Sequence, residues 1–202
     1  MSDYSAYDHN SSNNVVRFAA ALSVAVLIAQ ATIACPSHFV RLNVTASMPI
    51  GVYRQTGRAI TRGAIVGACV PPPYAGLAYA RGYLHSGICP LGVRPVMKYV
   101  AAVPGDSVEI RWSGVSVNGR RIANTGILPA DSLGRVIPSL VGSYVVGPDQ
   151  YWLISNRSPG SFDSRYFGPV TEILGVVEPI LTDEQLCRWS PFKNLLRCGG
   201  AK

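Results

Sequence analysis

The sequence predicts a mostly β protein with one hydrophobic segment near its N-terminus. Apolar residues make up 48% of the 202 residues and charged residues only 14%, which suits a folded core and is the opposite of a disordered chain. The 20 glycines and 15 prolines favour many turns and short strands over long helices. The chain shows no internal repeat and no alternation of strands with helices, so we expect a compact closed or semi-closed sheet.

The hydrophobic segment runs from Phe18 to Cys35 and carries no charge. As a helix it would be about 27 Å long, at the short end for crossing a membrane. A cleaved signal peptide is the alternative, because the end of the run is rich in alanine. Arg17 is the only basic residue before it, which is few for a signal peptide, so we expect an uncleaved anchor over residues 15–36.

Short apolar runs bounded by Gly and Pro predict the strands of the sheet. Asn118-Gly119 separates two alternating runs and is typical of a β-hairpin, and another turn is expected at Ser113-Gly114. The prolines at 71–73 are expected to end the strand before them. The predicted strands are 63–70, 93–103, 107–112, 115–122, 142–147, 150–155 and 170–181.

The segments between these strands differ in character. Residues 75–84 fit either a short helix or an irregular loop, residues 123–141 a long excursion, and residues 156–168 a polar loop. From Asp183 onward apolar residues recur at helical spacing, which predicts a stretch that packs on the domain or lies on a membrane surface. The predicted organisation is a polar tail (1–14), an anchor or signal segment (15–36), a β domain (37–182) and an amphipathic C-terminal tail (183–202).

The formal charge of +7 is compatible with several kinds of partner. Arginines are scattered singly and no nucleic-acid motif is present, so we expect membrane lipid as a partner and no nucleic acid. No spacing of Cys and His resembles a zinc site, and we expect no metal or other cofactor.

The five cysteines leave two interpretations open. If the domain lies outside the cytoplasm, the pairs 69–89 and 187–198 are candidate disulfides, and Cys35 is left over. Otherwise the cysteines are small buried apolar residues.

Lys98 is unusual because it sits inside an apolar strand, between Met97 and Tyr99. Burial penalises an ammonium group and lowers its pKa, and a neutral amine can act as a general base. Taken alone, a lysine whose amine reaches solvent at the strand edge is the commoner interpretation. Ser47, directly before Met-Pro, is on its own an ordinary loop serine.

Three motifs nevertheless occur in order: TASMPIGVY at 45–53, MKYVAAVPGD at 97–106 and SNRSPGSFDSRYFGPV at 155–170. With them the chain resembles the type I signal peptidase (S26) superfamily. That family's motifs run Ser-Met-x-Pro, Lys-Arg-x-x-Ala/Gly-x-Pro-Gly-Asp and Gly-Asp-Asn-Arg-x-x-Ser-x-Asp-Ser-Arg. The chain is more similar still to the TraF-type maturation peptidases of conjugative plasmids, which have the shortened form SMPxGxY. The resemblance covers about residues 43–178 and implies a signal-peptidase-like β-fold.

The chain departs from the signal peptidase pattern at four points. Pro49 comes one residue early, and Tyr99 stands where the family has arginine. Ile154-Ser155 replaces Gly-Asp, and the spacing from there to Ser161 is one residue longer. These departures bear on loop geometry and substrate preference.

The resemblance implies a Ser/Lys catalytic dyad. Ser47 Oγ is expected to attack a substrate carbonyl, while neutral Lys98 takes its proton and later delivers one to the leaving amine. This arrangement does not need a histidine, so His9, His38 and His85 are interpreted as incidental.

The same resemblance implies supporting roles for four more residues. Ser161 is expected to orient the lysine amine. The hydroxyl of Thr45 and the backbone N–H of Ser47 are the candidates for stabilising the oxyanion. Asp163 and Arg165 are expected to form an ion pair that supports the loop.

The implied function is a serine endopeptidase anchored in the bacterial inner membrane, with its catalytic domain in the periplasm. The implied substrate is the pilin precursor of a conjugative type IV secretion system, and either water or the pilin's own N-terminal amine resolves the acyl-enzyme. Ile50, Val52 and Tyr53 are candidates for a groove edge to which the substrate adds as a strand. The alternatives are a general type I signal peptidase and a non-catalytic periplasmic scaffold of the conjugation channel.

Overall fold

The computed structural model describes residues 17, 22–23 and 40–189. The chain divides into two units, residues 1–39 and 40–202, and the first contributes only helical Arg17, Leu22 and Ser23 to the description. No helix among the described residues is long and apolar enough to cross a membrane. The predicted anchor at 15–36 lies almost wholly outside the described residues, so it stays a prediction.

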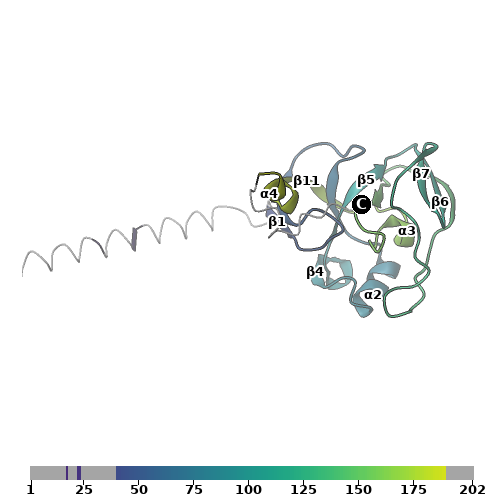
Figure 1. Cartoon of the computed structure of the whole chain (residues 1–202), viewed down its shortest axis with the longest axis horizontal. Coiled ribbons are helices and arrows are strands. Elements are labelled where there is room, and N and C mark those ends of the chain that lie inside the picture. Colours follow the sequence, from purple (N-terminus) through teal and green to yellow (C-terminus); the bar gives the residue numbers. More distant parts are fainter. Residues whose placement is uncertain (1–16, 18–21, 24–39, 190–202) are drawn as a thin grey trace, which may run out of the picture. The chain divides into compact units, whose positions relative to one another are not determined.

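The second unit is built on two antiparallel sheets (Figure 1). The larger sheet has six strands in the order β1-β2-β11-β3-β5-β10. Long β11 pairs with both β2 and β3, so it joins the N-terminal hairpin to the strands in the middle of the chain. The bounds are β1 Val40–Asn43, β2 Gly51–Thr56, β3 Ile65–Ala68, β5 Val96–Ala102, β10 Trp152–Ile154 and β11 Ile173–Thr182.

The smaller sheet has four strands in the order β8-β7-β6-β9. Its strands β6, β7 and β8 form a meander, and β9 pairs with the other edge of β6 after the excursion; β6 and β7 lie at the right-hand end of the domain in Figure 1. Asn118 and Gly119 both have positive φ, 48° and 76°, at the turn into β8, as a two-residue hairpin requires. The bounds are β6 Ser107–Arg111, β7 Gly114–Val117, β8 Arg120–Arg121 and β9 Gly142–Val145.

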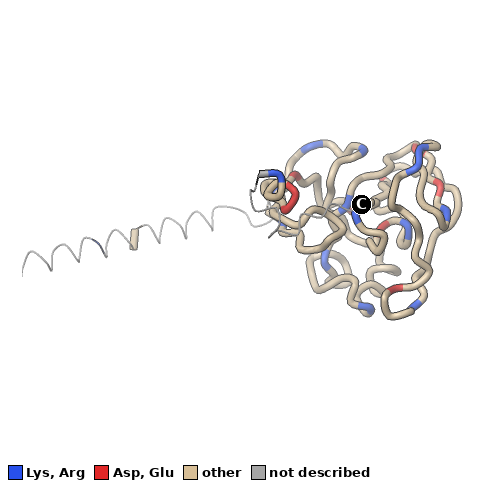
Figure 2. Tube along the Cα trace, in the orientation of Figure 1, with Lys and Arg blue, Asp and Glu red and all other residues tan. Residues whose placement is uncertain are grey.

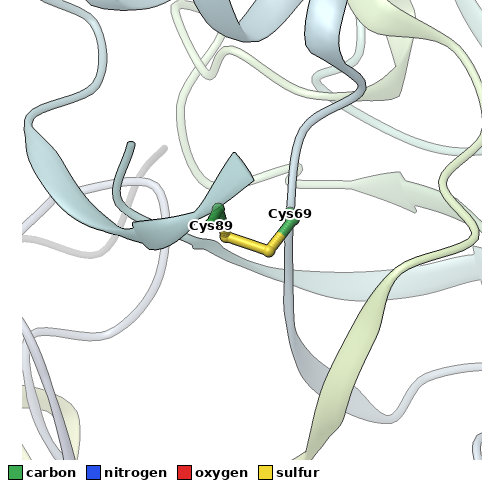
Figure 3. Close-up of a disulfide and its surroundings, with 2 residues drawn as sticks. All are labelled: Cys69 and Cys89. Atoms are coloured by element: carbon green, nitrogen blue, oxygen red, sulfur yellow. A yellow bond between two sulfur atoms is a disulfide. The ribbon is translucent and has the colours of Figure 1, made fainter. Parts of the chain in front are cut away.

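An insertion between β3 and β5 forms a separate lobe at the lower edge of Figure 1. It contains α2 (Pro72–Ala80), β4 (Ser86–Cys89) and the single turn η2 (Pro90–Gly92). A disulfide between Cys69 and Cys89 ties β4 to the segment that leaves β3 (Figure 3). The first predicted disulfide is therefore present, whereas Cys198 of the second lies outside the described residues.

Two apolar clusters meet around the third motif. One gathers residues of the large sheet and α2, the other the hairpins of the small sheet, and the ring of Phe162 packs against both. The motif itself contains the short helix α3 (Ser164–Phe167), which Asp163 caps through a hydrogen bond from the N–H of Arg165. The catalytic candidates on β5 and in the third motif therefore stand on the packed junction of the two sheets.

Most predicted strands are confirmed, with three differences. The strand before the prolines ends at Ala68, and Pro72 opens α2, since proline suits the first helical turn, which needs no N–H donor. The segment 156–168 is not loop throughout, because it contains α3. The predicted amphipathic tail begins with α4 (Asp183–Trp189), and its remainder, 190–202, lies outside the described residues.

Lys and Arg are spread over the domain in Figure 2, as their scatter in the sequence suggests.

Gly51 of the first motif is required by the backbone. It begins β2 at φ 156°, and a Cβ there would overlap the carbonyl oxygen of Leu181 and lie 2.7 Å from Thr182 Cα. Gly51→Ala should therefore lower the free energy of unfolding by at least about 2 kcal/mol. Gly57→Ala is the control, because a Cβ there meets nothing within 4 Å. Equal urea midpoints for the two variants would contradict this account.

Candidate active site

Ser47 lies in a tight turn between β1 and β2 that is held by side chains rather than by a strand ladder. Asn43, at the end of β1, donates from Nδ2 to the carbonyl oxygens of Thr45 (2.9 Å), Met48 (3.0 Å) and Pro49 (3.0 Å). Its Oδ1 accepts hydrogen bonds from the N–H and the hydroxyl of Thr45. One buried amide thus fixes the backbone on both sides of the candidate nucleophile.

The carbonyl of Ser47 itself is held from the third motif. The hydroxyl of Ser155 donates to Ser47 O. The backbone N–H of Ser155 in turn donates to Asp163 Oδ2 at 3.1 Å, and the Ser155 side chain is fully buried. The position of the nucleophile therefore depends on a residue 108 positions away in the sequence.

Lys98 meets Ser47 directly. It lies on the buried face of β5, only 5% exposed, and its Nζ is 2.7 Å from Ser47 Oγ. Burial lowers the pKa of Lys98 from 10.5 to about 8; the Asp163 carboxylate opposes this shift and Arg165 adds to it. About a tenth of this amine is therefore neutral at pH 7, and it is within hydrogen-bonding distance of the hydroxyl it would deprotonate.

Asp163 and Arg165 form a fully buried ion pair behind this dyad. Both Arg165 Nε and Nη2 lie 2.8 Å from the Asp163 carboxylate oxygens. The guanidinium also donates to the carbonyls of Gly126 (2.8 Å) and Ser161 (3.1 Å). The pair therefore joins the long excursion, the third motif and, through Ser155, the nucleophile turn.

Ser161 lines the same cavity as Ser47 and Lys98. Its side chain is 3% exposed, and its Oγ has no hydrogen-bond partner among the described residues. An unpaired buried hydroxyl is unusual. The structure brings Ser161 to the site but shows no hydrogen bond to Lys98, so its role in orienting the amine stays a prediction.

The two oxyanion candidates differ in their present partners. The hydroxyl of Thr45 lies 3.2 Å from Ser47 Oγ and donates to Asn43 Oδ1 at 2.9 Å, so it would have to leave Asn43 to reach an oxyanion. The N–H of Ser47 makes no hydrogen bond within the part of the chain that the structure describes. It is the donor that needs no rearrangement.

A cavity of about 720 Å³ opens beside the dyad. Its walls come from the nucleophile turn, the insertion lobe, β5, residues 128–137 of the excursion and the third motif. None of the three expected groove residues lines it, and Tyr53 is fully buried, where its hydroxyl donates to Pro49 O at 2.6 Å. Tyr53 holds the turn from its buried side, so the prediction that it borders the groove was wrong.

Sequence reasoning missed two residues that hold the nucleophile. Asn43 gave no signal beyond its place two residues before Thr45. Ser155 was visible only as a departure from the Gly-Asp of the family pattern. His85 was interpreted as incidental, yet it lines the cavity. The described residues contain no group of three or more His, Cys, Asp or Glu that could hold a metal ion.

Comparison with known proteins identifies the family of this chain. The family described as "Signal peptidase, peptidase S26" matches residues 12–181. The plasmid transfer protein TraF of Escherichia coli is 39% identical over 148 residues, 70% of this chain and 82% of that protein. The conjugal transfer protein TraF of Agrobacterium tumefaciens (strain 15955) is 38% identical over 164 residues, 78% of this chain and 91% of that protein.

A crystal structure of a signal peptidase I from Enterococcus faecalis aligns with 60% of this chain and 98% of its own, at 19% identity and a TM-score of 0.35. The family match and the two relatives decide the assignment. The chain belongs to the signal peptidase family, peptidase S26, and within it is related to the TraF conjugal transfer proteins.

Proposed function

We propose that this protein is a membrane-anchored serine endopeptidase that uses a Ser47/Lys98 dyad. The observation that carries the proposal is the 2.7 Å contact between Ser47 Oγ and the buried Lys98 amine. Its support comes from membership of a peptidase family and from the cavity that opens at the dyad. A lysine can serve as the base here because its burial keeps part of it neutral.

In the first step neutral Lys98 takes the Ser47 hydroxyl proton as Oγ attacks the substrate carbonyl carbon. The negative charge that develops on the carbonyl oxygen is received by the N–H of Ser47, with Thr45 able to add its hydroxyl after leaving Asn43. The Lys98 ammonium then protonates the departing amine as the C–N bond breaks. The product is an ester between Ser47 and the substrate.

In the second step Lys98, neutral again, deprotonates the acceptor as it attacks the ester carbonyl. The bond between that carbon and Ser47 Oγ then breaks, and the Lys98 ammonium returns the proton to Ser47 Oγ. Water yields a linear product. An amine of the substrate yields a new amide and a cyclic product, and it competes with water only if it is held close to the ester.

The relatives are named for plasmid or conjugal transfer, which supports a pilin precursor of a conjugative type IV secretion system as the substrate. We place the anchor, residues 15–36, in the bacterial inner membrane and the catalytic domain in the periplasm. The Cys69–Cys89 disulfide supports this placement, because such bonds persist in oxidising compartments.

The proposal is tested by the intact mass of the pilin precursor co-expressed with the enzyme. Wild type should trim the precursor, and Ser47→Ala or Lys98→Met should lower trimming at least about a thousandfold. A trimmed product one water lighter than the linear form would identify an amine acceptor, and the linear mass would identify water.

Thermal unfolding of both variants serves as the control. Each should stay folded, because Ser47→Ala removes one hydroxyl at the cavity and Lys98→Met replaces a buried amine by an apolar chain of similar length. Unchanged trimming by the variants would exclude Ser47 and Lys98 as the catalytic residues. If plasmid transfer were then lost only in strains that lack the whole protein, the non-catalytic scaffold would be favoured.

The pH profile of trimming follows from Lys98. Since the active form is neutral and its pKa is about 8, kcat/KM of the detergent-solubilised enzyme should rise about tenfold per pH unit up to pH 8 and then level off. A profile that is flat between pH 6 and 8 would contradict Lys98 as the base.

The same shift predicts a stability change that needs no turnover. Between pH 8 and 10.5 the unfolded chain holds the Lys98 proton more tightly than the folded one, so folding becomes more favourable as pH rises through this window. The gain should be roughly 3 kcal/mol in wild type and missing in Lys98→Met, as measured by urea unfolding at pH 7.5 and 10.5. Parallel changes in both proteins would exclude Lys98 as the source.

Two serines in the third motif separate a role in catalysis from one in folding. Ser161 Oγ has no partner, whereas Ser164 Oγ accepts from the Leu153 N–H at 2.8 Å. Ser161→Ala should leave the free energy of unfolding within about 0.5 kcal/mol and lower turnover at least about tenfold; Ser164→Ala should lose about 1–3 kcal/mol and keep its turnover per folded molecule. Full turnover in Ser161→Ala would remove its predicted role.

A further inference from the structure

The insertion lobe forms one wall of the cavity, and it presents two nitrogen-bearing side chains there. His85 and Arg94 both line the cavity, and the Arg94 N–H donates to His85 O at 2.6 Å, so the two residues face each other across a short ladder. Bridges pair Val93 of this ladder with Ser86 and Cys89, and Cys89 is fastened by the disulfide to Cys69. The wall is therefore a fixed structure and not a free loop.

The charge balance of the cavity is positive. Besides His85, its lining includes one carboxylate, Asp131, and two basic side chains, Arg94 and the partly neutral Lys98. The Asp131 carboxylate is already occupied, because it accepts from the Tyr83 hydroxyl, from Arg135 Nε (2.7 Å) and from two backbone N–H groups. Lys98 is committed to Ser47.

Arg94 is the remaining basic side chain of the cavity lining. Within the described part of the chain its guanidinium has no ion pair and no hydrogen bond, whereas six other arginines outside the buried Asp163–Arg165 pair form ion pairs with carboxylates. Its side chain is exposed, and the donor capacity of the guanidinium is open to a ligand in the cavity.

The floor of the cavity strengthens any such contact. Tyr83, Phe162 and Tyr166 line it, with ring centroids 5.3 Å apart for the first pair and 6.0 Å for the second. Aromatic rings exclude water and lower the local dielectric, so a charge pair formed inside the cavity is weakened less by solvent than one on the open surface.

We propose that Arg94, assisted by His85, binds a carboxylate that the substrate carries close to the cleaved bond. The site rests on the proposed peptidase function and gives it a substrate preference for acidic character beside the cut. The carboxylate has two sources, an Asp or Glu side chain or the C-terminal carboxylate of a substrate that ends just beyond the cut. The bidentate geometry of a guanidinium suits both.

The experiment measures trimming of the pilin precursor by Arg94→Glu, with Arg120→Glu as the matched control. Arg120 is exposed on β8 of the other sheet and has no partner among the described residues, so its reversal changes net charge equally. We expect Arg94→Glu to lower kcat/KM about tenfold or more and Arg120→Glu to leave it unchanged. Each Asp or Glu near the cut is then changed to Lys, and in a separate substrate the C-terminus is extended by Gly-Ser-Gly.

A charge swap decides the outcome. If the Arg94→Glu enzyme trims one of the Lys-substituted substrates as well as wild type trims the original, the carboxylate belongs to the side chain that was replaced. If wild type trims the extended substrate as poorly as the Arg94→Glu enzyme trims the original one, the carboxylate is that of the substrate's C-terminus. Equal trimming by Arg94→Glu and wild type overturns the inference, as does a loss that neither substrate change reproduces or repairs. Failure of wild type to trim, with Ser47→Ala identical to it, would instead overturn the proposed function itself.

Discussion

The buried ion pair between Asp163 and Arg165 is the constraint on which the rest of the site depends. Two charges without solvent exposure are expensive to bury, and they are tolerated only when every donor and acceptor is used. Here Asp163 also receives the N–H of Ser155, and Arg165 also donates to carbonyls of the excursion and the third motif. Removing either partner would leave a buried charge and free three segments at once.

The nucleophile turn shows why such a constraint is needed. Between β1 and β2 the backbone has no strand partner, so its carbonyls are held by Asn43, Tyr53 and Ser155. Two of these three belong to the first hairpin, and only Ser155 connects the turn to the part of the fold that carries Asp163. The position of Ser47 relative to Lys98 thus depends on contacts from the first hairpin and from the third motif.

The fold class and most strands could be predicted because apolar runs and turn residues are properties of the local sequence. The meeting of Ser47 with Lys98 was predicted only through the resemblance of three motifs to the signal peptidase family. The side chains that hold the nucleophile turn could not be predicted. Ser155 acts through a contact 108 residues away, and Asn43 through carbonyls that no side-chain pattern reveals. Tyr53 was misplaced because alternation along β2 does not show which face its neighbours cover. The wall that carries His85 and Arg94 depends on how the insertion folds back on the sheet, which periodicity does not encode.

Burial of Lys98 has a further consequence for the second chemical step. In the proposed mechanism the acceptor must come within reach of the Lys98 amine, which is only 5% exposed and contacts Ser47 at the cavity that both residues line. While the leaving segment fills that cavity, water has little access to the ester. Once it departs, an amine already tethered to the bound substrate arrives at a high effective concentration, whereas water arrives unguided. In the proposed mechanism the dyad acts in the same way for both acceptors, so the contacts that hold the acyl half in place would decide between a linear and a cyclic product.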